Sequence, residues 1–416
     1  MKGSISPSKR GSKKKSRVAS HIEELPKSGI RAFFDLVNAM DDVVSLGVGE
    51  PDFVTPWTIR ETAIYSLDRG RTSYTSNLGT LSLRKAVAGY LKTDFGLEYD
   101  PTCECLITVG VSEALDLAIR AITSPGDEII YHEPCYVSYP AEIRMAHGTP
   151  VAIPTFAGNK FALDPDEIEK AVTPATKAIL LNFPCNPTGA TLTLKQTQAI
   201  ADIARKHDLL VLADHIYTEL TYGPITPSIA TLPGMKERTI FLHGFSKAFA
   251  MTGFRIGYAC GPADIIDAMM KIHQYSMLCA PVMAQDAAED AILSARNDME
   301  AMRAEYKVRR NYIVKRLNGM GLKCLLPEGA FYAFADIRST GLSSPDFAMK
   351  LLEAEKVAVV PGGAFGPSGE GYIRCSYATS LDRIRTAMDR MERFVSGLPG
   401  KGKKRTGTRI KDRRRK

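Results

Sequence analysis

The chain has 416 residues, of which 44% are hydrophobic and 24% charged, a composition typical of globular proteins with a large buried core. It has no repeat period and no apolar run near the roughly 18 residues of a membrane span, which excludes solenoid and membrane-spanning architectures. The net charge of +8 is uneven: residues 1–18 carry seven basic side chains and no acid, and residues 401–416 carry ten basic and one acidic, which leaves −8 for the residues between.

Both ends of the chain, residues 1–22 and 397–416, are predicted to be disordered basic tails that remain solvated. Such tails can also bind nucleic acid or anionic lipid, and the first shares its basic, Ser-rich composition with organelle transit peptides. Residues 1–17 show no amphipathic stripe, so disorder is the interpretation we adopt. Eight scattered cysteines without zinc-site spacing, and no signal peptide, indicate reduced thiols, a cytoplasmic protein and no metal site.

The first elements after the tail are a helix at residues 29–44, with apolar residues at helical spacing, and a short strand at 43–46. From residue 105 the pattern changes to short apolar runs typical of buried parallel strands. These runs cover residues 105–109, 128–132, 178–182, 209–213 and 239–243. Helical stretches lie between them, at residues 112–122, 164–172 and 193–206. The alternation predicts a doubly wound α/β layer.

The pattern of apolar residues changes in the last third of the chain. Residues 282–318 have apolar residues in helical register and are predicted to form one or two helices that lead away from the sheet. Beyond them, predicted strands at 331–336, 357–360 and 372–375 mix with predicted helices at 344–354 and 382–396. We therefore expect a large domain at 55–290, a smaller α+β domain at 291–396, and a segment at 23–54 that packs with the smaller domain.

Ligands of α/β sheets bind where strands end at their carboxyl edge, so the residues that follow each predicted strand are the first candidates for a site. Gly110 follows the first strand and precedes a helix that we expect Ser112 to cap. Free N–H groups and the helix dipole at such a start bind phosphate. A glycine turn here is also ordinary strand-to-helix topology, and both interpretations stay open at this point.

Asn186 follows the strand at 178–182 and is bracketed by two prolines in the string Phe-Pro-Cys-Asn-Pro-Thr-Gly. Prolines remove backbone freedom, and a stiff loop is suited to aiming one amide side chain. The alternative is an ordinary turn rich in Asn, Pro and Gly.

Asp214 closes the strongly apolar strand at 209–213. A carboxylate at a buried strand end is costly unless it meets a cation, and a protonated pyridinium nitrogen would be such a cation. A helix N-cap or a surface acid at the start of a loop is the alternative.

Lys247 lies a few residues after the strand at 239–243, in the apolar string Gly-Phe-Ser-Lys-Ala-Phe-Ala. Such a setting would lower the pKa of the lysine and free its amine to attack an aldehyde. Arg255, eight residues later, is suited to a forked contact with phosphate. A solvated surface lysine is the alternative.

Together these motifs resemble the class I and II aminotransferase family, the fold type I pyridoxal-phosphate enzymes. The resemblance covers about residues 26–396, and the Asn-Pro-x-Gly, Asp-x-x-Tyr and Ser-Lys-x(7)-Arg elements occur in the family's order and at its spacings. It implies an α/β large domain with a mostly parallel seven-stranded sheet between helices, and a smaller α+β domain.

The resemblance implies a role for each matching residue. Lys247 would carry pyridoxal 5′-phosphate as a Schiff base and move the substrate's proton. Asp214 at the ring nitrogen and Tyr217 at the phenolic oxygen would be further catalytic residues. The remaining cofactor contacts would come from Ser112, the backbone N–H of Glu113, Tyr136 stacked on the ring, Asn186, Ser246 and Arg255.

The resemblance also concerns the substrate and a second subunit. Arg374 would grip the α-carboxylate of the substrate with its planar fork, beside Asn186 and the backbone of Gly49. Tyr74 resembles the tyrosine that reaches the cofactor phosphate of the neighbouring subunit, which implies a homodimer with shared active sites.

One position departs from the family pattern, because His215 stands where glutamate usually follows the aspartate. It is either a packed or solvent-facing histidine, or one that shifts the electrostatics near Asp214.

The implied activity is ping-pong transfer of an amino group from an L-amino acid to a 2-oxo acid, in amino-acid metabolism or biosynthesis. Glutamate and 2-oxoglutarate would be the common pair, with a donor of the aspartate, aromatic or acyl-diaminopimelate type. A C–S β-lyase on the same fold is left open by these residues. A regulator that binds nucleic acid through the basic tails is a third alternative, although no helix-turn-helix pattern fits in the short tails.

Overall fold

The predicted apolar runs after residue 105 form one seven-stranded sheet. In the computed structural model, which describes residues 16–23, 25 and 40–398, its strands lie in the order β2-β8-β7-β6-β5-β3-β4. Their bounds are β2 (Cys105–Thr108), β3 (Glu128–Glu133), β4 (Thr149–Pro154), β5 (Thr176–Asn182), β6 (Leu210–Asp214), β7 (Thr239–Gly244) and β8 (Gly257–Cys260). All neighbouring pairs are parallel except those of β8, which runs antiparallel to β2 and β7. The prediction of a mostly parallel seven-stranded sheet is confirmed.

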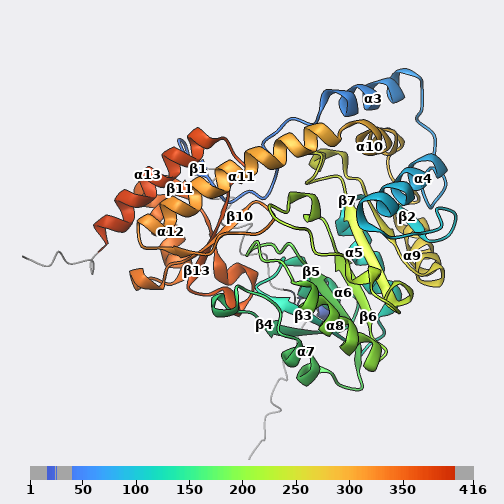
Figure 1. The fold of residues 1–416 in the computed structure, drawn as a ribbon, viewed down its shortest axis with the longest axis horizontal. Helices are drawn as coiled ribbons and strands as arrows, with labels where there is room; N and C mark the ends of the chain where they lie inside the picture. Colours follow the sequence, from blue (N-terminus) through green and yellow to red (C-terminus); the bar gives the residue numbers. More distant parts are fainter. Residues whose placement is uncertain (1–15, 24, 26–39, 399–416) are drawn as a thin grey trace, which may run out of the picture.

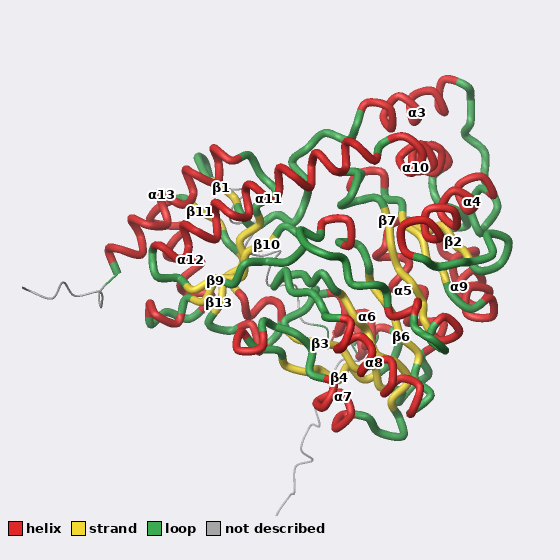
Figure 2. The backbone as a smooth tube through the Cα atoms, viewed as in Figure 1, coloured by secondary structure: helices red, strands yellow, loops and turns green. Residues whose placement is uncertain are grey.

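Helices cover both faces of this sheet because side chains alternate along each strand. Leu180 and Leu212 belong to the apolar cluster formed with α5 and α9, while Ile179 and Val211 belong to the cluster formed with α7 and α8. The helices of this part of the chain are α3 (Trp57–Asp68), α4 (Leu81–Tyr90), α5 (Gly110–Ile122), α6 (Ser138–Met145), α7 (Pro165–Ala171), α8 (Leu194–Lys206), α9 (Ala263–Ser276) and α10 (Val282–Ser294). Figure 2 shows the strands of the large sheet enclosed by these helices.

The predicted helical run at 282–318 is two helices, α10 and α11 (Arg296–Gly319), which meet at Ala295. Met299 near the start of α11 packs into an apolar cluster of the large-sheet layer, whereas Tyr306 and Ile313 pack into a second core. Figure 1 shows α11 running from α10 towards a separate group of strands and helices. This helix therefore ties the two parts of the molecule together.

The second group contains a four-stranded antiparallel sheet in the order β12-β13-β10-β9 and a two-stranded parallel sheet of β1 and β11. Its elements are β1 (Val44–Ser45), β9 (Lys323–Cys324), β10 (Tyr332–Asp336), α12 (Ser344–Glu355), β11 (Val357–Ala358), β12 (Val360–Pro361), β13 (Tyr372–Ser376) and α13 (Leu381–Gly397). The helices and sheets together form a smaller α+β unit, as the sequence predicts. Because β1 pairs with β11, residues 44–45 join this unit. The exact domain boundaries stay a prediction.

Some sequence predictions concern residues outside those that the structure describes. The helix at 29–44 lies almost wholly there, as do most of both basic tails, and a short helix α1 occupies Ser20–Glu23. Among the described residues, no helix combines the length and the apolar composition needed to cross a membrane.

Candidate active site

A cavity of about 590 Å³ lies at the carboxyl ends of β5, β6 and β7. Its opposite wall comes from residues 47–50 and from two side chains of the small antiparallel sheet, Tyr332 and Arg374. All but two of the predicted site residues line this cavity: Gly49, Ser112, Tyr136, Asn186, Asp214, Tyr217, Ser246, Lys247, Arg255 and Arg374. The fold thus brings together side chains that are far apart in the sequence.

Asp214 is the last residue of β6 and is buried. Its Oδ2 accepts a hydrogen bond from the Tyr139 hydroxyl at 2.8 Å, and its Oδ1 accepts one from the Ile216 N–H at 3.1 Å. Burial raises the pKa of the Asp214 carboxyl, and these two hydrogen bonds lower it in part. Within the described ranges, no lysine or arginine forms an ion pair with this carboxylate. A buried acid in this setting suits a cationic ligand group.

The loop after β5 is held by side-chain amides. Asn182, the last residue of β5, donates from Nδ2 to the Asp214 carbonyl at 3.1 Å and accepts at Oδ1 from the Asn186 N–H at 3.2 Å. The loop then closes on itself, because the Gly189 N–H donates to the Cys185 carbonyl at 2.8 Å. Asn186 is consequently buried and aimed into the cavity, as its two flanking prolines suggest.

Lys247 extends into the cavity from the segment after β7. Its Nζ donates to the Gly49 carbonyl at 2.8 Å. Burial lowers the pKa of Lys247 to about 8; the carboxylate of Glu50 acts in the other direction, and the positive charges of Arg374 and Arg255 lower the pKa further. A larger share of this amine is therefore neutral at physiological pH than of an ordinary lysine.

Arg374, on β13, is buried without an acidic partner among the described residues. Its Nη1 donates to Asn186 Oδ1 at 2.9 Å and its Nη2 to the Gly47 carbonyl at 2.6 Å, while Nε is buried with no hydrogen-bond partner in that part of the chain. The guanidinium lies 4.4 Å from the ring centroid of Tyr332 and 4.7 Å from that of Phe365. A buried guanidinium with a spare donor suits a ligand carboxylate.

Two tyrosines line the cavity between Asp214 and Arg374. The hydroxyls of Tyr217 and Tyr332 lie 2.8 Å apart and share a hydrogen bond. Burial raises the pKa of both phenols, so both are neutral donors at physiological pH. The Tyr332 hydroxyl also faces Gly49 closely, since a Cβ at Gly49 would lie 2.3 Å from it.

The start of α5 lies at the other end of the cavity. The helix begins at Gly110, whose φ of +76° favours glycine, and not at Ser112. The expectation that Ser112 caps the helix is wrong, because α5 starts two residues earlier and Val109 occupies the cap position without a side-chain hydrogen bond. Ser112 instead lies in the first turn, where N–H groups have no intrahelical acceptor.

Arg255 lies against this helix start. A Cβ at Gly110 would be 2.9 Å from its Nη2, and its Nη1 donates to the Thr252 carbonyl at 3.1 Å. The helix N-terminus and the guanidinium together present positive potential to the same corner of the cavity. Ser246 lines that cavity as well.

Tyr74 and Glu113 are the two predicted site residues that do not line the cavity. The Glu113 carboxylate accepts from the Val109 N–H at 2.5 Å and contacts His273 Nδ1 at 2.7 Å, so its side chain faces the helix layer. The sequence implied only its backbone N–H, in the first turn of α5. Tyr74 is 83% exposed and contributes nothing to the cavity of its own chain.

His215 is a packed histidine. Its ring stacks on Phe241 with centroids 4.4 Å apart, and its two nitrogens lie within hydrogen-bonding distance of Thr218 Oγ1 (3.0 Å) and Ser228 Oγ (2.9 Å). Burial lowers the pKa of His215 to about 3, so the ring is neutral. The packed interpretation is therefore confirmed.

Sequence reasoning missed two side chains of the site. Tyr139 lies three residues after Tyr136 in α6, and the two rings meet edge to face with centroids 5.7 Å apart. Tyr332 is the first residue of β10. Tyr136 precedes α6, which begins at Ser138, so helix periodicity did not link Tyr139 to the predicted Tyr136. No local pattern indicated Tyr332 either.

The cavity residues fit pyridoxal phosphate. The cofactor has an aldehyde, a ring nitrogen that binds a proton, a flat aromatic face and a phosphate. The cavity offers, in turn, an amine of lowered pKa at Lys247, a buried acid at Asp214, an aromatic ring at Tyr136, and a helix N-terminus with Arg255. The orphaned Nε of Arg374 leaves a separate donor for a substrate carboxylate.

Comparisons with known proteins agree with a site for this cofactor. The family model "Aminotransferase class I and II" matches residues 41–391. The chain is 54% identical to the Bacillus subtilis protein named "Putative aminotransferase YugH" (91% of this chain, 98% of the relative) and 45% identical to an aspartate aminotransferase of Pyrococcus abyssi (91% and 98%). The crystal structure of an aromatic aminotransferase from Pyrococcus horikoshii superposes with a TM-score of 0.84 at 45% identity, covering 88% of this chain and 98% of that one.

Fold, site and relatives define a pyridoxal-phosphate enzyme of fold type I. It uses this cofactor to move amino groups between amino acids and 2-oxo acids. The chain belongs to the class I and II aminotransferase family.

Proposed function

We propose that Lys247 is the Schiff-base lysine and proton carrier of this aminotransferase, with Asp214 and Tyr217 as its catalytic partners. The observation that carries the proposal is the meeting, in one cavity, of an amine of lowered pKa, a buried acid and a buried arginine with a free donor. When bound, the cofactor supplies the electron sink that makes the Cα–H bond of an amino acid acidic.

Lys247 would hold the cofactor through Nζ and, in its free form, would serve as the base for the proton on the substrate's Cα. Its pKa of about 8 supports both roles, because nucleophile and base must be neutral. The hydrogen bond from Nζ to the Gly49 carbonyl supports these roles, because it orients the Lys247 side chain across the cavity.

Asp214 would pair with the cofactor's ring nitrogen and would keep it protonated. Its burial supports this role, since a desolvated carboxylate gains most from a cationic partner, and Tyr139 fixes its orientation. Asn186 and Tyr217 would hydrogen-bond the ring's phenolic oxygen, and Tyr136 would stack on the ring. The phosphate is held by Ser112, the N–H of Glu113, Ser246 and Arg255 at the start of α5.

Arg374 binds the α-carboxylate of the substrate, next to Gly49. Two of its donors already hold Asn186 and Gly47, which fixes the plane of the guanidinium before the substrate arrives. The orphaned Nε marks the edge that the carboxylate satisfies.

The second subunit is part of the proposal. Tyr74, exposed in one copy, reaches the phosphate of the partner's site, so the active enzyme is a homodimer with shared sites. We also propose a cytoplasmic protein, with a large domain at 55–290, a small domain at 291–396, and an N-terminal segment at 23–54 that packs with the small domain.

The donor is proposed to carry an aromatic side chain, with glutamate and 2-oxoglutarate as the common pair. Lysine and arginine side chains line the cavity only at Lys247, Arg255 and Arg374 among the described residues, and each has a role already. The lining also includes apolar and aromatic side chains, for example Val48, Val137 and Tyr332, and the acid Glu50, which would repel an acidic donor side chain. Relatives named for aromatic amino acids, aspartate and N-acetyl-LL-diaminopimelate make these three donors the set to compare.

The test of the lysine assignment is Lys247→Ala beside the matched surface control Lys271→Ala, whose side chain forms an exposed pair with Asp267. The parent protein and the control should show the cofactor's absorbance band near the visible edge and should convert 2-oxoglutarate to glutamate. Lys247→Ala should lose both band and turnover. Retention of both would refute the assignment, and pyruvate plus ammonia without a new amino acid would indicate β-elimination instead.

A further inference from the structure

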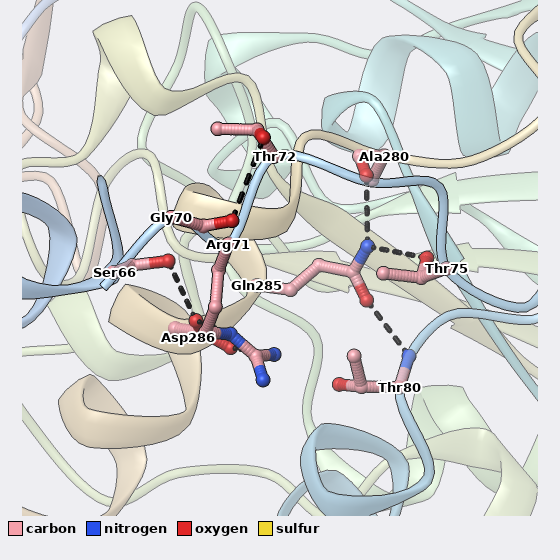
Figure 3. Close-up of polar contacts among 9 residues, drawn as sticks. All are labelled: Ser66, Gly70, Arg71, Thr72, Thr75, Thr80, Ala280, Gln285 and Asp286. Atoms are coloured by element: carbon pink, nitrogen blue, oxygen red, sulfur yellow. Dashed lines mark hydrogen bonds and ion pairs between the residues drawn. The ribbon is translucent and has the colours of Figure 1, made fainter. Parts of the chain in front are cut away.

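Residues 70–80 connect α3 to α4 and carry Tyr74, whose side chain projects from the surface with 83% of its area exposed. Loops with one exposed tip and few internal contacts are usually mobile. This segment is different, because side chains of α10 bind the Arg71 side chain before Tyr74 and the Thr80 N–H after it. Figure 3 shows these α10 side chains with Arg71 and Thr80.

Gln285 makes the first set of these contacts. Its side chain is fully buried, and its amide is hydrogen-bonded on both ends. Oε1 accepts from the Thr80 N–H at 2.8 Å, and Nε2 donates to Thr75 Oγ1 at 3.0 Å and to the Ala280 carbonyl at 2.8 Å. Figure 3 shows this amide between Thr75 and Thr80 of the segment and Ala280, which precedes α10. One side chain therefore fixes the two residues that bound the C-terminal half of the segment.

Asp286, the next residue of α10, makes the second set. Its Oδ2 accepts from Arg71 Nε at 2.7 Å and from the Ser66 hydroxyl at 2.7 Å, while Oδ1 accepts from Arg71 Nη2 at 2.9 Å. The pairing of both carboxylate oxygens with the Arg71 fork is geometrically specific. Because Ser66 belongs to α3, Asp286 joins the end of that helix to the beginning of the segment.

Tyr74 thus lies between two anchored points, Arg71 three residues before it and Thr75 directly after it. A further hydrogen bond, from Asn77 Nδ2 to the Leu278 carbonyl at 2.7 Å, joins the segment to the chain just before α10. The segment is anchored on both sides of Tyr74, while the aromatic side chain stays exposed and free to contact another molecule.

We propose that Gln285 and Asp286 are positioning residues that hold the Tyr74 segment in the geometry needed to complete the phosphate site of a second copy of the chain. This inference rests on the proposed function of Tyr74. It adds that the affinity of one subunit for the cofactor phosphate depends on side chains in α10 of the other, neither of which lines the cavity of its own chain.

The two anchors differ in their expected weight. The Arg71–Asp286 pair is partly exposed, with 49% and 18% of the side chains accessible, and exposed pairs contribute little individually. Gln285 is buried, and its removal leaves the Thr80 N–H and the Ala280 carbonyl without their partners. Gln285→Leu is therefore the decisive variant, and Asp286→Asn is expected to have the same effect in smaller measure.

The test compares two ligands, pyridoxal phosphate and pyridoxal, titrated into full-length apoprotein in phosphate-free buffer. The ratio of their dissociation constants isolates the contribution of the phosphate. Gln285→Leu should lower the preference for the phosphorylated form by about tenfold, which corresponds to the loss of roughly one hydrogen bond. The affinity for pyridoxal should stay unchanged. Glu289→Gln, one turn further along α10, is the matched control and should preserve the parent ratio.

Tyr74→Phe separates this inference from the proposed function. If Tyr74→Phe lowers the ratio and Gln285→Leu adds no further loss in the double variant, the two residues act through one contact and the inference is supported. If Tyr74→Phe lowers the ratio while Gln285→Leu leaves it unchanged, the positioning role is wrong and the role of Tyr74 stands. If Tyr74→Phe has no effect, both fail.

If Gln285 has a purely structural role, Gln285→Leu should weaken the binding of pyridoxal phosphate and of pyridoxal by the same factor. This result would overturn the inference. Gln285→Glu is the second variant in case Gln285→Leu does not fold. It keeps an acceptor for the Thr80 N–H but cannot donate to the Ala280 carbonyl, and it should reduce the ratio by less than Gln285→Leu.

Discussion

Replacing Gly49 with alanine should displace Tyr332 and impair both stability and catalysis. The new Cβ would lie 2.3 Å from the Tyr332 hydroxyl oxygen, whereas ordinary contacts begin at 3.4 Å. The tyrosine is fully buried and its ring is rigid, so the hydroxyl cannot turn aside alone. Movement of the ring would break its hydrogen bond with Tyr217, and movement of residue 49 would shift the carbonyl that accepts from Lys247 Nζ.

The expected loss of stability is the sum of two costs, the overpacking of the site and the broken hydrogen bond between the tyrosine hydroxyls. Overpacking of a buried site costs about 1–3 kcal/mol, and the lost hydroxyl pair about 1 kcal/mol more. Gly49→Ala should therefore lower the free energy of unfolding of the apoprotein by about 2–4 kcal/mol, measured by urea denaturation. Tyr332→Phe removes the clashing oxygen and leaves ring carbons at 3.2 and 3.3 Å, only slightly too close. The double variant should thus be more stable than Gly49→Ala alone.

This double-mutant cycle also identifies the result that would refute the reasoning. If Gly49→Ala matches the parent in stability and in kcat/KM, the close contact between residue 49 and Tyr332 does not exist in solution. If the double variant is less stable than Gly49→Ala by the full cost of Tyr332→Phe, the two sites are independent and the steric argument is wrong.

Three further predictions concern the charged groups of the site. The Lys247 pKa lies at about 8 in the folded chain against 10.5 for an ordinary lysine, so the unfolded state binds more protons between these two pH values. The free energy of unfolding of the apoprotein should therefore increase as pH rises through this window. In urea denaturation measured at several pH values, Lys247→Met should lack this part of the pH dependence. Asp214→Asn removes a desolvated carboxylate, so the melting temperature of the apoprotein should stay equal or rise, while kcat should fall about 100-fold or more. A large loss of stability in this variant would contradict the argument that burial disfavours the charge of Asp214. Arg374→Lys keeps a charge but loses the planar fork, so KM for the amino donor should rise about 10- to 100-fold with an unchanged circular dichroism spectrum; a KM equal to that of the parent would remove Arg374 from the substrate site.

Elements with a strong local pattern were predictable from the sequence. The parallel strands β5, β6 and β7 are continuous apolar runs, and each is followed by the residue or motif that faces the cavity. The strands β4 and β8 were missed for identifiable reasons. β4 is an edge strand with a proline at position 150 and little burial, and β8 is a strand of only four residues that begins just after Arg255 and Ile256, in a stretch where Arg255 was read only for its chemistry.

The candidate site was likewise predictable only where its residues lie in a distinctive local sequence. Lys247, Asp214 and Asn186 were found because each follows a strand in a distinctive string. The contacts that orient them join residues far apart in the chain, such as Tyr217 with Tyr332, 115 positions later, and Asn186 with Arg374, 188 positions later. Such pairs depend on how the small sheet docks against the large one, and no local periodicity records that docking.

In their proposed roles, Arg374 would bind the carboxylate of the amino acid and Asn186 would bind the cofactor ring, and the hydrogen bond between the two side chains couples these contacts. A substitution at either position leaves the other with an unsatisfied group in a buried environment. The free-energy effects of changes at these two positions should therefore not sum. Any effort to change how this enzyme holds the α-carboxylate by altering position 374 would have to be selected together with position 186.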